Sequence, residues 1–512
     1  MTCKNIKNTT APKCAVNPYL PGWEYVPDGE PHVFNDRVYV FGSHDQAGGT
    51  AFCQQDYVAW SAPTDDLSDW RCEGVIYRKD QDPHNTKDLK ELWAPDVCKG
   101  TDGRYYLYYC CAFVPEIGIA VCDQPAGKYE FYDYVRDESG EIWSQDLPFD
   151  PGILFEDPEH IWLYTGFGSE PSLLPDNLTI EMLRAADSFK NMSEKELLKI
   201  VDQAKLLNNP SKYSSCLRLA PDMKTVIALS HAAPAKQKAA GTSFEEHPFF
   251  EASSIRRIHD TYYFIYSSLQ GHELCYATSQ YPDRDFIFRG VIVSNADLGY
   301  KGNSKPIAYY GNNHGSIEKI CNRWYIFYHR HTNNTMFSRQ GCIEPIQILE
   351  DGSIPQVEVT SCGPNNAPLP ASGSYSAHIC CNLTGPDGAC LIDNGKKMPE
   401  NTPYITEELL ENGIKNQYVY NMQQNAVCGV KYLQFKGENG ISLMLRGNGV
   451  LQILLDDPDS TLAVGNVCVD NSSDWTEYTV SISEQHGVHA VYFKVSDSDS
   501  YVDFSEFRFG RN

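Results

Sequence analysis

Asp150-Pro-Gly-Ile-Leu-Phe-Glu-Asp-Pro-Glu-His-Ile-Trp-Leu-Tyr-Thr-Gly166 contains the pattern that decides the fold. The segment begins with a polar residue, called its head below. A short apolar strand, a tight turn and an aromatic-rich strand follow. Four other segments repeat this order, and their heads are Asp28, Asp96, Glu251 and His314. Because a two-strand unit cannot bury its apolar faces alone, repetition at this scale predicts blades stacked around a common axis.

The heads of such blades converge on the axis, which brings Asp28, Asp150, Glu251 and His314 together from distant parts of the chain. Convergent carboxylates in a cleft are what glycoside hydrolysis requires. A single Asp before a strand is more often a turn or capping residue. The inference of a catalytic site therefore rests on the three acids together, because each stands at the head of a blade. Asp96 is interpreted as structural, with its carboxylate binding backbone amides.

The length of 512 residues predicts two domains. Residues 1–14 read as a flexible tail, and residues 15–360 contain the five repeats. Residues 361–369 are rich in Pro, Gly and Ser, which is typical of a linker. Residues 370–512 alternate short apolar runs with turns, which predicts a β-sandwich of the jelly-roll kind. The expected fold is all-β: a five-bladed β-propeller followed by this sandwich.

A helical insertion is expected over residues 178–208, in the longest gap between two heads. Ser193 and Glu196 have the spacing of a capping box, and Leu197 and Val201 follow at helical spacing. We expect one or two helices between blades 3 and 4. They would either wall the pocket or decorate its rim, and the rim is favoured.

Composition and charge argue against several classes of binding partner. A net charge of −25 argues against nucleic acid and against an anionic membrane, since both need a basic face. No run of 18 or more apolar residues exists that would span a bilayer. The N-terminus lacks the apolar core of a signal peptide, and the 18 cysteines show no paired C-x-x-C spacing. These features predict a reduced, cytoplasmic protein, and they leave a homo-oligomer open.

With these motifs in place, the chain resembles glycoside hydrolase family 43, whose members are inverting enzymes on a five-bladed propeller. The resemblance covers roughly residues 15–360. It rests on several motifs in the right order: Asp28 eight residues before Asp36, Trp93-Ala-Pro-Asp-Val97, Asp150-Pro-Gly-Ile-Leu-Phe155, Glu251, Gly311-Asn-Asn-His314-Gly and Arg339-Gln-Gly-Cys-Ile-Glu344.

The resemblance implies three catalytic roles. Asp28 stands in the place of the general base, Asp150 in that of the pKa modulator and Glu251 in that of the general acid. The family's Asp-Pro head reads Asp28-Gly-Glu30-Pro31 here, so Glu30 remains a rival base and a candidate contact to substrate. The Glu-Ala-Ser sequence at Glu251 also departs from the common Glu-Gly/Ala-Pro.

The resemblance also implies binding roles. Trp93 would supply a stacking wall, and Arg339 would bind sugar hydroxyls with its planar guanidinium. His314 corresponds to the central histidine, which would lie near the acid or contact an axial ion through water. No cofactor is required, no metal ligand is certain, and a structural calcium ion on the propeller axis is compatible with the motifs.

The C-terminal part is similar to a family 6 carbohydrate-binding module. Asp474-Trp-Thr-Glu-Tyr-Thr-Val480, Gly487-Val-His-Ala-Val-Tyr-Phe493 and Asp503-Phe-Ser-Glu-Phe-Arg-Phe509 carry this likeness. The loops with which such modules bind glycans are not evident. A buttress for the propeller is therefore favoured slightly over glycan binding.

Inverting hydrolysis needs a protonated acid and an ionised base on opposite faces of the sugar, about 6.5–9.5 Å apart, to admit the attacking water. The expected activity is that of an exo-acting enzyme of carbohydrate metabolism, which releases terminal α-L-arabinofuranosyl residues from plant-derived oligosaccharides. β-Xylosidase activity on xylo-oligosaccharides is the alternative. A non-catalytic glycan-binding propeller is an alternative of another class. A fructan-active propeller is disfavoured, because blade 1 lacks an Asn-Asp-Pro-Asn head.

Overall fold

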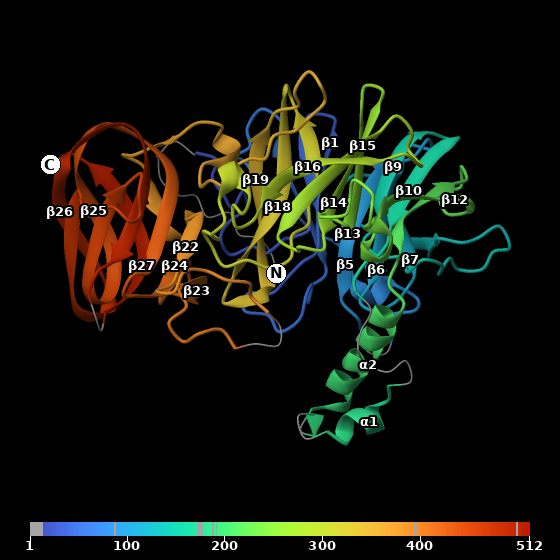
Figure 1. Cartoon of the computed structure of the whole chain (residues 1–512), viewed down its shortest axis with the longest axis horizontal. Coiled ribbons are helices and arrows are strands. Elements are labelled where there is room, and N and C mark those ends of the chain that lie inside the picture. Colours follow the sequence, from blue (N-terminus) through green and yellow to red (C-terminus); the bar gives the residue numbers. More distant parts are fainter. Residues whose placement is uncertain are drawn as a thin grey trace.

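The computed structural model describes residues 14–86, 89–170, 178–186, 189–190, 192–393, 397–497 and 500–511. Their strands form five small antiparallel sheets, arranged as blades, and one larger C-terminal sheet (Figure 1). The predicted all-β fold, a five-bladed propeller followed by a second β domain, is confirmed. The predicted N-terminal tail lies outside the described residues except for Cys14.

Each blade is a meander in which consecutive strands pair antiparallel. Blade 1 comprises β1 (Glu30–Phe34), β2 (Arg37–Phe41), β3 (Tyr57–Pro63) and β4 (Arg71–Tyr77). Blade 2 comprises β5 (Leu92–Lys99), β6 (Tyr105–Cys111), β7 (Ile117–Cys122) and β8 (Glu130–Tyr134). Blade 3 comprises β9 (Gly152–Asp157), β10 (His160–Thr165), β11 (Tyr213–Leu219) and β12 (Val226–Pro234). Blade 4 comprises β13 (Phe249–Ile258), β14 (Thr261–Ser268), β15 (Glu273–Ser279) and β16 (Ile287–Ser294). Blade 5 comprises β17 (Ile317–Ile320), β18 (Arg323–Thr332) and β19 (Thr335–Ile346).

The first strands of the blades lie side by side around the axis: β1 contacts β5 and β17, while β9 contacts β5 and β13. The blades approach so closely that side chains are excluded at some points. A Cβ atom on Gly152 would meet the carbonyl oxygen of Ser253 at 2.1 Å, so only glycine fits where blade 3 touches blade 4. The heads of the strands therefore meet at one end of the axis.

A buried guanidinium joins the first strands along the axis. Arg256 of β13 donates to Glu30 Oε2 at 3.0 Å and to Pro31 O at 2.9 Å, both in blade 1. Its Nη1 donates to Ser254 Oγ at 3.3 Å, and its Nε lies 3.5 Å from Glu318 Oε2 of blade 5. One buried cation from blade 4 thus links acids of two other blades.

The N-terminal segment closes the ring between blades 5 and 1. Asn17 Nδ2 donates to Ile343 O at 2.9 Å and to Thr360 O at 3.0 Å, and Ile343 N donates back to Asn17 Oδ1 at 2.8 Å. Tyr19 and Leu20 pack in a core that contains residues of both blades. Segments more than 300 residues apart are held together by one fully hydrogen-bonded amide.

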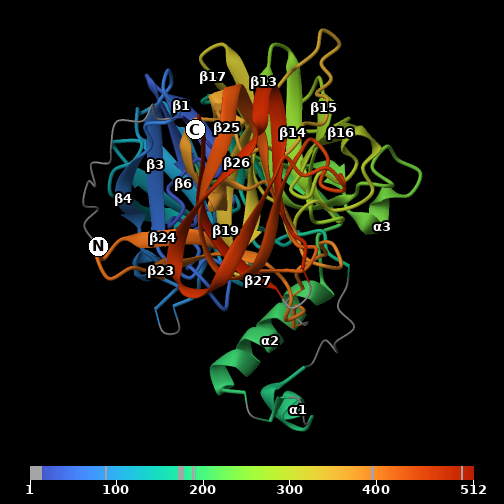
Figure 2. The same cartoon turned by 90° about the vertical axis from the view of Figure 1, so that its left-hand side faces the viewer.

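The helical insertion lies within blade 3. Helices α1 (Ile180–Arg184) and α2 (Glu194–Asn208) follow β10 and precede β11, which pair with each other in the same sheet. The prediction that the insertion separates blades 3 and 4 was wrong, because the sequence pattern located the gap between two heads but not the strand pair that it interrupts. The two helices project away from the propeller (Figures 1 and 2). A short third helix, α3 (Lys236–Ala239), follows β12.

The C-terminal strands form one eight-stranded sheet that curls around one large core, with a smaller cluster beside it. The long strands β25 and β26 pair along most of their length, and Leu451 pairs with both Val467 and Val495, so the sheet folds back on itself. The strands are β20 (Leu369–Pro370), β21 (Ser374–Ser376), β22 (Asn382–Thr384), β23 (Tyr404–Leu409), β24 (Lys415–Gln423), β25 (Val427–Leu455), β26 (Gly465–Val495) and β27 (Tyr501–Gly510).

This C-terminal sheet packs beside blade 5 (Figure 1). Arg330 of β18 donates to Cys380 O at 2.9 Å and to His378 O at 2.7 Å. Lys431 of β25 pairs with Glu358 at 2.9 Å. Ser361, at the start of the predicted linker, is buried and donates from its backbone N to Lys431 O at 2.7 Å. The connection between the two domains is therefore tightly packed.

Replacement of Arg256 by Met should destabilise the propeller strongly, because it leaves buried carboxylates without a cation. Breaking a buried pair in this way costs about 3–5 kcal/mol. The neighbouring Arg257 pairs with Glu156 at 2.7 Å, but its side chain is 45% exposed. Arg257→Met should therefore leave the urea-unfolding midpoint, followed by tryptophan fluorescence, nearly unchanged. Equal shifts in the two variants would contradict the axial role of Arg256.

Candidate active site

The predicted catalytic heads adopt a backbone conformation that most residues avoid. Asp28 has φ 56°, Asp150 has φ 45°, and Ala252, directly after Glu251, has φ 64°. Left-handed values are uncommon outside glycine, although Asp tolerates them better than most residues, and they often mark functional positions. The turn into each first strand aims these side chains at the axis.

The heads surround one cavity of about 350 Å³. All five blades contribute to its wall, so the three predicted catalytic acids meet as expected. Its lining comprises Asp28, Thr50, Ala51, Phe52, Cys53, Glu91, Trp93, Ala94, Phe113, Phe149, Asp150, Phe167, Phe250, Glu251, Asn312, His314, Met336, Phe337 and Arg339. None of these belongs to α1 or α2, so the described part of the insertion does not wall the cavity.

Asp28 is held in its ionised form. Burial alone would raise the pKa of its carboxyl, but the Arg339 guanidinium, together with the nearby His329, outweighs burial and holds that pKa well below its usual range. Arg339 Nη1 donates to Asp28 Oδ1 at 2.8 Å, and His329 Nδ1 lies 3.3 Å from the same oxygen. An ionised carboxylate in a cavity is suited to remove a proton from water.

The pKa values of Asp150 and Glu251 are raised, in contrast to that of Asp28. Burial raises the pKa of Glu251 to about 8, with a further increase from the charge of Asp28. Burial and the neighbouring Glu251 raise the pKa of Asp150 well above its usual range. Two buried carboxyl groups this close titrate as a pair that retains a proton at neutral pH. The cavity therefore contains one ionised carboxylate and a proton-bearing pair, which is the division of roles that inversion needs.

His314 lies between the base and this pair. Its Nδ1 is 3.5 Å from Asp150 Oδ2 and 4.0 Å from Asp28 Oδ1. Burial lowers the pKa of His314 to about 4, so the imidazole is neutral at neutral pH. A neutral ring can donate a hydrogen bond to a carboxylate without adding a charge that would pull the proton from Glu251.

Arg339 lines the cavity, but acids bind most of its donors. Its Nε and Nη2 donate to Asp45 Oδ2 at 2.8 Å and Oδ1 at 3.1 Å, and Asp45 is fully buried. Cys53 N donates to Asp45 Oδ1 at 2.9 Å, which fixes the carboxylate. Sequence reasoning missed Asp45 as the residue that orients Arg339 toward Asp28. Its place directly after an aromatic strand, in Gly42-Ser-His-Asp45, was the available signal.

An arc of aromatic rings forms one wall. Trp93 contacts Phe113 and Phe149, with centroids 4.9 and 5.1 Å away. Phe167 continues the arc at 4.8 Å from Phe149 and 5.1 Å from Phe250, the residue before Glu251. Trp93 thus lies where the sequence predicted a stacking wall. The four phenylalanines were missed, because nothing in the pattern separated them from core residues.

Glu30 does not lie in the site. Its side chain is absent from the cavity wall and pairs with Arg256, so the prediction that it contacts substrate was wrong. Burial and the charge of Asp96 raise the pKa of Glu30 to about 7. Glu30 opens β1 two residues after Asp28, and the strand carries it down the axis. Asp28 is therefore the only one of the two rival bases that lines the cavity.

Three axial residues form a group of potential calcium ligands. Glu30, His32 and Asp96 place potential ligand atoms within 4.8 Å of one another. Calcium prefers about six to eight oxygen ligands. Both Asp96 oxygens already accept backbone donors, from Val97 N at 2.6 Å and Ile153 N at 2.7 Å, and Arg256 provides the cation. These residues do not fit calcium, and Asp96 binds backbone amides as predicted.

A curated relative matches nearly the whole chain. The "Xylosidase/arabinosidase" of Thermoclostridium stercorarium is 47% identical over 495 residues, which cover 94% of this chain and 96% of that protein. The model of Glycosyl hydrolases family 43 matches residues 26–215. The chain belongs to glycosyl hydrolases family 43. It is a glycoside hydrolase, and the resemblance predicted from the motifs is confirmed.

Other similar proteins are more distant in sequence. A "Xylosidase/arabinosidase" of Bacteroides ovatus is 25% identical over 328 residues, which cover 61% of this chain and 87% of that protein. A solved family 43 arabinoxylan arabinofuranohydrolase of Bacillus subtilis, in complex with cellotetraose, is 21% identical, with a TM-score of 0.48 and 97% of each chain covered.

The division of charge in this family 43 site predicts the pH dependence of kcat/KM. Glu251 must hold a proton to act as an acid, so activity should be lost as pH rises through about 8. The lowered pKa of Asp28 keeps the base ionised below pH 4, so no acidic loss should arise from it. In Glu251→Gln the loss near pH 8 should disappear, whereas the exposed Glu246→Gln should retain it. A loss of the same shape in both variants would exclude Glu251 as the group observed.

Proposed function

We propose that this glycoside hydrolase is an exo-acting, inverting enzyme that releases terminal α-L-arabinofuranosyl residues from plant-derived oligosaccharides. The observation that carries the proposal is one cavity with an ionised Asp28 and a proton-bearing Asp150–Glu251 pair. In this scheme Asp28 deprotonates the attacking water and Glu251 protonates the departing oxygen. Asp150 supports the proton on Glu251 through its proximity.

Exo action is supported by the wall of the cavity. Residues of all five blades line it, among them Phe52, Phe113, Phe167, Phe250 and Phe337. A chain end can enter such a pocket, whereas an internal sugar would have to extend through the wall on both sides. The aromatic arc offers apolar faces on which a sugar ring can stack.

β-Xylosidase activity on xylo-oligosaccharides is the second candidate. It is favoured by the names of relatives, because the Thermoclostridium stercorarium protein is called both xylosidase and arabinosidase, and a 26% identical protein of Xylanibacter ruminicola is called "Beta-xylosidase". A non-catalytic role is disfavoured by the two protonation states within the cavity. The cytoplasmic location stays a prediction from the sequence, and it favours short imported oligosaccharides. Within the described residues, no helix is long and apolar enough to span a bilayer.

The sugar and the stereochemical outcome can be read in one experiment. Proton NMR of the reaction with arabinosylated xylo-oligosaccharides should show the released pentose first as the anomer opposite to the substrate linkage. Arabinose should appear before xylose. Release of xylose alone would establish the second candidate, and retention of configuration would contradict the assignment of Asp28 as a base.

The role of Glu251 can be tested with leaving groups. Glu251→Gln should lower kcat on oligosaccharides by about 10²–10⁴-fold, the usual contribution of general acid catalysis. The loss should be far smaller with 2,4-dinitrophenyl pentosides, whose leaving group needs no proton. Asp28→Asn should reduce both reactions to a similar extent, because water must be activated in each. A loss with Glu251→Gln that is the same for both substrates would argue against its role as the acid.

A further inference from the structure

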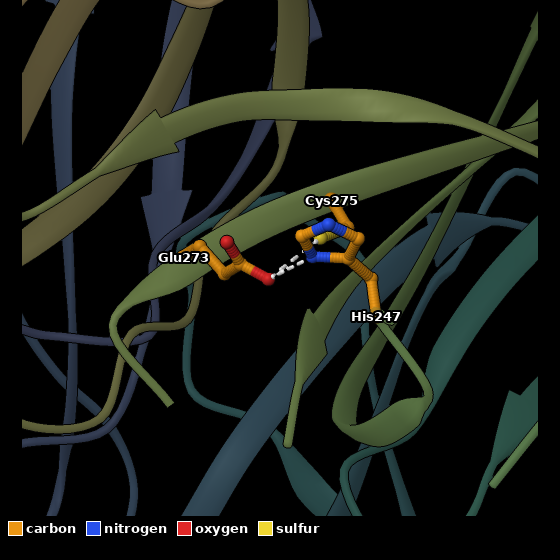
Figure 3. A group of neighbouring side chains, drawn as sticks. All are labelled: His247, Glu273 and Cys275. Carbon is orange, nitrogen blue, oxygen red and sulfur yellow. Dashed lines mark hydrogen bonds and ion pairs between the residues drawn. The ribbon is translucent and has the colours of Figure 1, made fainter. Parts of the chain in front are cut away.

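Three side chains of the types that bind metals lie close together in blade 4 (Figure 3). His247 Nδ1 lies 2.6 Å from Glu273 Oε1, and Cys275 Sγ lies 3.5 Å from the same oxygen. The ligand atoms of all three residues are within 4.8 Å of one another. None of the three lines the cavity that contains Asp28 and Glu251.

The strands of blade 4 fix this cluster from several sides. Glu273 and Cys275 are two residues apart on β15, so their side chains point to the same face of the strand. Ser268 of β14 donates to Glu273 Oε1 at 2.5 Å. Phe288 of β16 stacks on the His247 ring, with centroids 4.7 Å apart and an angle of 9° between planes. The donors are thus held in place by the surrounding sheet.

We propose that His247, Glu273 and Cys275 form a zinc-binding site. Imidazole nitrogen, thiolate sulfur and carboxylate oxygen are the ligands that Zn²⁺ takes in proteins, and three protein ligands leave the fourth position to water. Zn–N and Zn–O distances near 2.0 Å and Zn–S near 2.3 Å imply separations of about 3.3–3.8 Å between tetrahedral ligands. The sulfur–oxygen distance already matches, whereas the nitrogen and oxygen must separate by under about 1 Å.

Access and proton release are both accounted for. The His247 side chain is 29% exposed, whereas that of Glu273 is 6% exposed, so an ion can reach the cluster past the imidazole. Zinc would take the place of the proton on His247 Nδ1, which can move to Nε2, and would displace the thiol proton of Cys275, so at least one proton leaves for each ion bound. Because the thiol must lose its proton to bind zinc, the affinity should fall as pH falls.

Occupation of the site would stiffen the strand that carries the proposed acid. His247 precedes Glu251 by four residues, and Tyr266 of β14 donates to His247 O at 2.7 Å. Glu251 pairs with Ser267, the neighbour of Ser268. Zinc would therefore join the segment before β13 to β15 across β14, without contact to the reacting atoms.

Cobalt(II) gives the test a spectroscopic signature. Co²⁺ added to chelator-treated enzyme should bind one equivalent and produce a thiolate-to-cobalt absorption band with intense visible bands of a tetrahedral ion, and Zn²⁺ should abolish both. Cys275→Ser should lose the thiolate band, and His247→Gln should lose tight binding. Cys468→Ser, which removes an exposed thiol elsewhere, should retain the full signal.

Two further outcomes decide against the site. A thiolate band that persists in Cys275→Ser and disappears in Cys468→Ser would mean adventitious binding at surface cysteines. Absence of any thiolate band in the native enzyme would mean that His247 and Glu273 form an ion pair only. Hydrolysis of nitrophenyl pentosides by the metal-free variants shows that they are folded, because none of the substituted residues lines the cavity.

Discussion

The ion pair between Arg339 and Asp28 is the interaction on which the site depends. It crosses the seam between blade 5 and blade 1, and Asp45 holds the guanidinium from the other side. A cavity with three buried carboxyl groups would otherwise keep all of them protonated, since burial disfavours charge. The fixed cation makes one acid ionise while Asp150 and Glu251 retain a proton. Ionised and protonated carboxyl groups therefore lie in the same cavity.

A second buried arginine pairs with acids along the axis of the propeller. Arg256 provides the cation for Glu30 and Glu318, which come from blades that are far apart in sequence. Each arginine binds acids of blades other than its own, so the packing of the ring and the electrostatics of the site depend on the same contacts. A variant that loosens the seam between blades should therefore affect both stability and the protonation of the heads.

The sequence revealed the architecture because the blades repeat. Asp28, Asp150 and Glu251 could be placed together from their positions at strand heads, since a ring of blades allows no other arrangement. The partners of these acids could not be found in this way. Asp45 and the phenylalanines of the arc lie outside the repeated segments, and His329 lies in a repeated strand whose pattern does not distinguish it from its neighbours. Only folding shows which of many buried polar or aromatic residues face the cavity. The sequence pattern also could not exclude Glu30. It lies only two residues after Asp28, but this distance along the strand places its side chain outside the cavity.

The buried ion pairs on the propeller axis have a consequence for how substrate and products move. Among the described residues, the Arg256 guanidinium and its acids are buried on the axis beneath the heads, so we expect no passage through the ring. Substrate must arrive, and both products must depart, through the same mouth lined by the aromatic arc. Under the proposed exo action, the detached remainder of the oligosaccharide has to leave before the freed monosaccharide can escape, so we expect an ordered release of the two products.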